Sequence, residues 1–138
     1  MNSHSKISVM QHNTARTSDI MHSCLETAVK QAIDFVLIQE LSIRFENNIA
    51  ITVSHSAYYC ILSTSSDNIR PRVAVFARKL SNYKFCHRTD LTSDSDIIII
   101  DVSGSNIKTF QIINIYNERS LNTESDINYT VKRSLQHI

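Results

Sequence analysis

Short apolar runs typical of β-strands lie on either side of one long stretch with helical spacing near the start of the chain. Residues 7–13 and 35–40 are rich in apolar and β-branched residues, which favours strands. Between them, the Thr-Ser-Asp run at 17–19 offers a helix N-cap. Residues 6–40 therefore predict a βαβ unit. A strand, a helix and a parallel strand in one sheet imply a right-handed crossover. The apolar positions of its helix recur every three or four residues: Ile20, Met21, Cys24, Leu25, Ala28, Val29 and Ala32.

The rest of the chain predicts further strands and one more helix. Residues 42–57 are mostly polar and predict a loop. Two short apolar runs, 58–62 and 73–77, predict strands. Residues 96–102 and 107–116 predict a hairpin around the Ser-Gly-Ser-Asn turn at 103–106. Near the end, an apolar stripe predicts a helix over 126–138, formed by Ile127, Val131, Leu135 and Ile138.

Composition fits one globular α/β domain spanning residues 1–138. The chain has 138 residues, of which 42% are hydrophobic and 20% charged, so a packed core is expected and a second domain is not. The formal net charge is only +1, so any nucleic-acid contact must be local rather than driven by an overall basic field.

Scarcity of glycine excludes several kinds of nucleotide-binding and catalytic site. The sequence has 1 glycine and 1 proline, whereas the P-loop, the dinucleotide-binding loop and the nucleophile elbow each need at least two nearby glycines. The 3 cysteines lack a CxxC spacing, which argues against a zinc site and a disulfide framework. Without a signal sequence or a membrane-length apolar run, we expect a soluble, intracellular protein with no membrane association.

Two oxygen-bearing residues end the two parallel strands. Asn13 closes the first strand and Glu40 the second, so both are predicted at the same edge of the sheet. Ligands of open α/β sheets bind outside the carboxyl ends of the strands, and hard cations prefer oxygen ligands. This pair therefore predicts the beginning of a cation and phosphate site. Two simpler interpretations stay open: Asn13 as a turn residue before the helix, and Glu40 as an exposed carboxylate.

Four short motifs carry a resemblance to a known family. They are Gln11-His12-Asn13, Ile38-Gln39-Glu40, the Arg-Val-Ala-Val-Phe run at 72–76, and the Ile-Asn-Ile-Tyr-Asn run at 113–117. In order and approximate spacing, the chain resembles the endonuclease/exonuclease/phosphatase family, and more narrowly the endonuclease domain of non-long-terminal-repeat retrotransposons in fungal versions. The resemblance implies the N-terminal half of a two-sheet α/β sandwich of the DNase I-like type.

The resemblance also implies roles for individual residues. Glu40 matches the glutamate that binds Mg²⁺ (or Mn²⁺), Asn13 the asparagine of the phosphate and metal network, and Tyr116 the tyrosine that contacts the scissile phosphate. The flanking residues implied to contact DNA phosphates are Asn114, Asn117 and Arg72. The implied partner is DNA, and the implied location is the nucleus. Tyr116 also has a simpler interpretation as a core aromatic residue with its hydroxyl at the surface.

Two later motifs of this family do not occur in the sequence. These are Gly-Asp-x-Asn, which orients the nucleophile, and Ser-Asp-His, whose histidine lies against the phosphate. General-base assistance is typically worth about 10²–10⁴-fold in rate, so this chain alone is predicted to be weak or inactive. A non-catalytic remnant or binding module is the alternative. A half-domain would expose sheet surfaces, so we expect self-association or association with the missing half.

A basic stretch in the middle of the chain has two interpretations. Arginines and lysines between residues 70 and 88, with Tyr83 and Phe85 among them, fit either a patch that tracks phosphates or a solvated β-edge. His12 alternates to the opposite face from Asn13 and is predicted to have a packing or solvated role rather than a catalytic one.

Overall fold

The βαβ unit forms as the sequence predicts. The computed structural model describes residues 6–66 and 68–117. Strand β1 (Val9–Asn13) and strand β2 (Phe35–Gln39) pair in parallel, with Asn13 opposite Gln39, and helix α1 (Ser18–Lys30) connects them. Glu40 therefore lies one residue beyond β2, at the same edge as Asn13.

Helix α1 covers one face of a four-stranded sheet. The sheet has the order β1-β2-β6-β5 and is completed by β5 (Tyr58–Leu62) and β6 (Val73–Arg78), both in antiparallel pairing. The buried stripe of α1 packs against side chains of β2 and β6 in one hydrophobic cluster, which includes Met21, Leu25, Ala28, Val36, Ile38 and Phe76.

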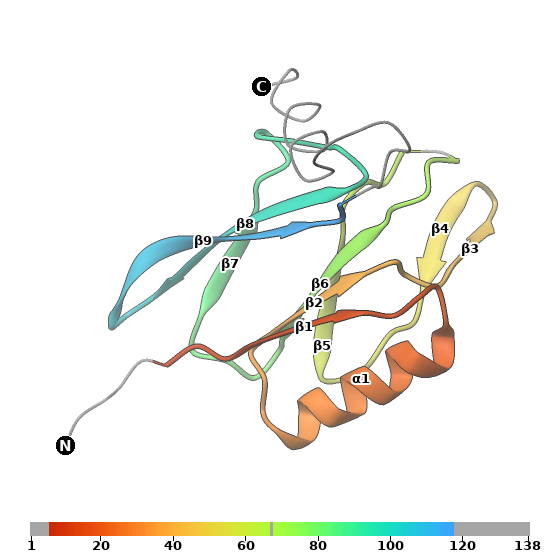
Figure 1. The fold of residues 1–138 in the computed structure, drawn as a ribbon. Helices are drawn as coiled ribbons and strands as arrows, with labels where there is room; N and C mark the ends of the chain where they lie inside the picture. Colours follow the sequence, from red (N-terminus) through yellow and green to blue (C-terminus); the bar gives the residue numbers. More distant parts are fainter. Residues whose placement is uncertain (1–5, 67, 118–138) are drawn as a thin grey trace.

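A three-stranded antiparallel sheet covers the opposite face. It consists of β7 (Lys84–His87), β8 (Ile97–Gly104) and β9 (Ile107–Ile115) in that order. The predicted hairpin at 103–106 is confirmed as the β8–β9 connection. Figure 1 shows the resulting layers, with α1 below the four-stranded sheet and the three-stranded sheet above it.

The space between the two sheets holds a second hydrophobic cluster. Strands β2 and β6 are almost entirely buried because they are covered on both faces, which explains their continuous apolar sequences. The cluster is formed by Phe35, Leu37, Val73, Val75 and Ala77 from the first sheet and Ile98, Ile100, Val102 and Ile112 from the second. This packing fixes the end of β9 above the end of β2.

The predicted loop at 42–57 is wrong in part. Strands β3 (Ile43–Glu46) and β4 (Ile49–Thr52) form a two-stranded antiparallel hairpin there. Its turn is Asn47-Asn48, with φ of 50° and 67°, the left-handed values that a two-residue hairpin turn requires and asparagine tolerates. The predicted helix at 126–138 lies outside the described residues. No helix in the described part of the chain is long and apolar enough to cross a membrane.

Candidate functional site

Glu40 is held at the sheet edge by its own backbone. Its N–H donates to the Arg72 carbonyl at 2.9 Å, and its carbonyl accepts from the N–H of Arg16 at 2.8 Å. The Thr14 hydroxyl also donates to this carbonyl, at 2.9 Å. Glu40 has φ of 52°, in the left-handed region that a glutamate rarely adopts. Such conformations cost on the order of 1 kcal/mol or more and persist where the surroundings enforce them, so these bonds fix the direction of the side chain.

The Tyr116 hydroxyl bonds to the Glu40 carboxylate. It donates to Oε1 at 3.1 Å, and the backbone N–H of Tyr116 donates to the Asp96 carbonyl at 2.8 Å. Burial raises the pKa of Tyr116, and the hydrogen bond to Glu40 and its negative charge raise it further. Tyr116 is therefore protonated at neutral pH and serves as a hydrogen-bond donor. The structure thus brings together two residues that are 76 positions apart in the chain.

Arg72 lies beside this pair. Its guanidinium carbon is 5.5 Å from the centre of the Tyr116 ring, and its Nε is 3.1 Å from Oδ1 of Asp96. The Asp96 side chain is fully buried, whereas the Arg72 side chain is 29% exposed. Asp96 thus anchors a partly exposed positive charge beside the Tyr116 ring, where an anionic phosphate could reach it.

Asn114 lies beneath the site rather than at its surface. The residue is 1% exposed. Its Nδ2 donates to the carbonyls of Ile38 at 3.2 Å and Ala74 at 2.8 Å, and its Oδ1 accepts from Nε2 of Gln39. Its amide therefore ties β9 to β2 and β6. The predicted DNA contact of Asn114 is untested, and this geometry favours a role in positioning the strand ends.

Asn13 and Asn117 are exposed at the same rim. The Asn13 side chain accepts a hydrogen bond from the Ala15 N–H at 2.9 Å. Asn13 therefore acts as a turn residue before the helix, which is one of the two interpretations of its sequence position. That turn leaves Asn13 at the sheet edge, opposite the residue that precedes Glu40. Asn117 directly follows Tyr116. The predicted phosphate contacts of both asparagines stay predictions.

The donors at this rim fit one part of a magnesium site. The described residues contain no group of three or more His, Cys, Asp or Glu side chains that could hold a metal ion. Mg²⁺ is commonly bound by one or two carboxylates, with water and substrate phosphate oxygens completing the octahedron. Glu40 fits as one such ligand, and the buried Asp96 is already paired with Arg72.

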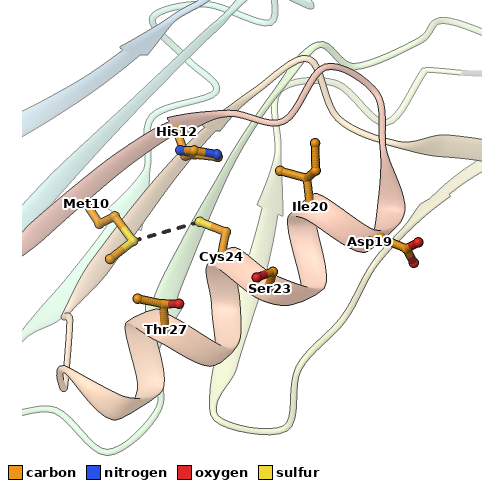
Figure 2. Close-up of a pocket in the computed structure, with 7 residues that line it drawn as sticks. All are labelled: Met10, His12, Asp19, Ile20, Ser23, Cys24 and Thr27. Carbon is orange, nitrogen blue, oxygen red and sulfur yellow. Dashed lines mark hydrogen bonds between the residues drawn. The ribbon is translucent and has the colours of Figure 1, made fainter.

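A cavity between β1 and α1 is separate from this rim. Figure 2 shows it with Met10 and His12 on β1 facing α1. The Cys24 thiol lies 3.8 Å from the Met10 sulfur. His12 thus lies on the helix side of the sheet, as its alternation with Asn13 predicts. Burial raises the pKa of Cys24, so its thiol is a packing group here rather than a nucleophile.

The basic stretch of the middle chain does not form one patch. Only Arg70 and Arg72 precede β6 at the candidate site. Arg78 pairs with Asp34 at 2.8 Å, and Arg88 bonds to both Asp90 and Asp101. Both of these arginines are thus paired with carboxylates away from Glu40, and the phosphate-tracking and solvated-edge interpretations of the stretch stay predictions.

Comparison with known proteins identifies the fold. No protein-family model and no curated protein matches the sequence. Among solved structures, the chain is similar to the endonuclease domain of TRAS1, a telomere-specific non-LTR retrotransposon, with a TM-score of 0.69 and 15% identity. This chain shares its fold with part of that endonuclease domain. The match covers 96% of this chain and 53% of the TRAS1 domain chain, so this chain spans about half the length of that domain.

The endonuclease-domain fold supports the resemblance drawn from the four motifs, and nothing in it bears on a fungal origin. Sequence reasoning missed Arg16 and Asp96. Arg16 lies in the turn after β1, and Asp96 directly precedes β8. A charged residue just before the most apolar run of the chain was the available signal for Asp96, but only sheet packing reveals its partner.

Proposed function

We propose that this chain forms the Glu40-bearing half of a Mg²⁺-dependent phosphodiesterase site that nicks DNA, in the manner of a non-LTR retrotransposon endonuclease acting in the nucleus. One observation carries the proposal. In an endonuclease-domain fold, Glu40 is fixed in a left-handed backbone conformation with its carboxylate bonded to Tyr116. The likeness to the TRAS1 domain supports a nuclease-like function, and Mg²⁺ (or Mn²⁺) dependence is our inference from the donor set.

Each residue of the rim has a task in this proposal. Mg²⁺ bound at Glu40 would polarise a phosphoryl oxygen and stabilise the charge of the leaving oxygen. The single proton of the Tyr116 hydroxyl orients the Glu40 carboxylate, and it would become available to a phosphate oxygen only where that carboxylate binds the metal instead. Arg72 adds positive charge on the same side, and exposed Asn13 and Asn117 offer amide donors. Asn114 keeps the three strand ends in place from below.

Activation of the attacking water is the task that no described residue takes. The Gly-Asp-x-Asn and Ser-Asp-His motifs do not occur in the sequence. We therefore propose that the chain alone is weak or inactive as a nuclease, and that full activity requires these groups from the other half of the domain. A non-catalytic remnant or binding module is the second candidate, favoured by the same missing motifs.

A metal-binding and nicking experiment tests the proposal. In the first assay, the purified chain is titrated with Mn²⁺, a spectroscopic stand-in for Mg²⁺, to measure metal binding. In the second, the chain is mixed with supercoiled plasmid in Mg²⁺ to measure nicking. We expect weak Mn²⁺ binding in the presence of DNA that Glu40→Gln abolishes and the exposed-helix variant Glu26→Gln retains. Equal binding by both variants would overturn the assignment of Glu40. Rapid nicking by the chain alone would overturn the proposed need for the second half.

A further inference from the structure

Three arginines lie next to Glu40 and Leu41 at the end of β2. Arg16 and Arg72 flank it through backbone hydrogen bonds, with Arg16 donating to the Glu40 carbonyl at 2.8 Å and Arg72 accepting from the Glu40 N–H at 2.9 Å. Arg70 approaches from the same segment as Arg72, and its Nη2 donates to the carbonyl of Leu41 at 3.2 Å. Two loops distant in sequence thus bring three arginines next to the Glu40–Leu41 backbone.

These arginines are close enough to repel one another. Burial lowers the pKa of Arg70, and the positive charges of Arg16 and Arg72 lower it further. The charge of Arg16 also reaches Tyr116, whose pKa it lowers against the raising effects of burial and Glu40. Gathering like charges costs free energy, and an anion that bridges them recovers it. The arrangement therefore favours a polyanion across the rim.

A hollow lined by hydroxyl groups continues from the arginines. Its volume is about 510 Å³, and it lies between the segment before Arg70 and the segment before β8. The Arg72 N–H donates to the Ser95 carbonyl at 3.0 Å, which joins this hollow directly to the candidate site. Asp94 also lines it, but its Oδ1 accepts from the Asp96 N–H at 2.9 Å. The hydroxyl-bearing residues of the hollow are Thr64, Ser66, Thr92, Ser93 and Ser95.

We infer that Arg16 and Arg70, together with Arg72, bind backbone phosphates of DNA on both sides of the phosphate that faces Glu40, with the strand continuing into the hydroxyl-lined hollow. Arginine and hydroxyl side chains are the usual partners of DNA phosphates, and they fix register without reading sequence. The inference rests on the proposed function for the phosphate at Glu40. Phosphate binding by the arginines needs neither metal nor cleavage.

Binding measured without metal tests this inference apart from the nuclease proposal. Fluorescence anisotropy of a labelled duplex oligonucleotide is followed in EDTA over a range of salt concentrations. We expect Arg16→Ala and Arg70→Ala each to weaken binding roughly threefold to tenfold and to reduce the salt slope by about one. Lys108→Ala, at the far end of β9, is the matched control and should leave both quantities unchanged.

Glu40→Gln gives a second readout in the same assay. Removing a negative charge next to the arginines should leave the affinity for DNA in EDTA equal to that of the unmodified chain or higher. A lower affinity would contradict phosphate binding by Arg16, Arg70 and Arg72. The inference is overturned if Arg16→Ala and Arg70→Ala behave like Lys108→Ala. Arg70→Gln keeps donors for the Leu41 carbonyl and replaces Arg70→Ala if that variant unfolds. Failure of metal binding at Glu40 would overturn the nuclease proposal and leave these results intact.

Discussion

At the scale of single residues, the candidate site depends on a carboxylate whose direction is set by its backbone. A glutamate at φ of 52° is unusual, and three hydrogen bonds from neighbouring segments hold it there. Its carboxylate is directed to the Tyr116 hydroxyl across the gap between the two sheets. Local strain of this kind is found where geometry matters more than stability, which is consistent with a functional role for Glu40.

The Tyr116 pKa should report this contact. The hydrogen bond and charge of Glu40 both raise the pKa of Tyr116, after burial, so Glu40→Gln should move it down toward its ordinary value near 10. A raised tyrosine pKa stabilises the fold below the ordinary value, and this stabilisation is lost as pH rises through the folded value. The alkaline limb of the stability curve should therefore change in Glu40→Gln. NMR titration of the tyrosine ring carbons measures the shift, and Glu26→Gln should leave it unchanged.

Asn114 should matter for stability more than any exposed asparagine at the rim. Asn114→Ala would remove the buried side-chain bonds to the carbonyls of Ile38 and Ala74 and to the Gln39 amide. We expect a loss of roughly 2–3 kcal/mol in the free energy of unfolding. Urea denaturation measures it, with Asn117→Ala as the exposed control, expected within about 0.5 kcal/mol of the unmodified chain. Equal values for the two variants would contradict the bridging role.

At the scale of elements, a charged clamp ties the first strands together. Asp34, at the start of β2, bonds through Oδ1 to Arg78 of β6 at 2.8 Å and through Oδ2 to the Ser8 N–H at 3.0 Å. The Asp34 side chain is only 6% exposed. The clamp thus joins the beginnings of β1 and β2 to the end of β6, opposite the candidate site.

Breaking this clamp should destabilise the fold. Asp34→Ala removes the partner of Arg78 and of the Ser8 N–H, so we expect a loss of roughly 2 kcal/mol in the free energy of unfolding. The exposed pair of Arg44 and Glu46 provides the control, because surface ion pairs contribute little. Thermal denaturation of Asp34→Ala and Glu46→Ala compares them. A Tm for Asp34→Ala as high as that of Glu46→Ala would show that the clamp adds nothing.

The sequence predicted these elements unevenly, for physical reasons. The βαβ unit and the β8–β9 hairpin follow from local periodicity and a strong turn, so Asn13 and Glu40 could be placed at one edge. The β3–β4 hairpin was missed because each of its strands has only 4 residues, too few for a clear alternation, although Asn47-Asn48 was an available turn signal. The partners of Asp96 and Asn114 depend on how two sheets pack, which no local pattern encodes.

At the scale of the whole molecule, both sheets end in open strands on the same side. Among the described residues, β1 pairs only with β2, and β9 pairs only with β8. Strand β9 reaches β2 through Asn114, which places β9 on the β1 side of the molecule. On the opposite side, the rings of Tyr59 on β5 and Phe85 on β7 are in contact. Open edges of this kind recruit further strands. This chain spans about half the length of the TRAS1 domain chain, and the second half that we propose above would be a source of such strands.

These edges should make the isolated chain self-associate. Val9 on β1 is 47% exposed and Ile113 on β9 is 49% exposed, so both strands present apolar side chains, and within the part of the chain that the structure describes each has one strand neighbour. We expect sedimentation velocity to show species larger than the monomer as concentration rises. Lysine on an edge strand opposes strand addition, so Val9→Lys and Ile113→Lys should each shift the distribution toward monomer. Ile49→Lys alters a still more exposed apolar residue, 63% exposed, on the β3–β4 hairpin and should not shift the distribution. A chain that stays monomeric at every concentration, or that responds equally to Ile49→Lys, would show that these edges are not the surface that a second half covers.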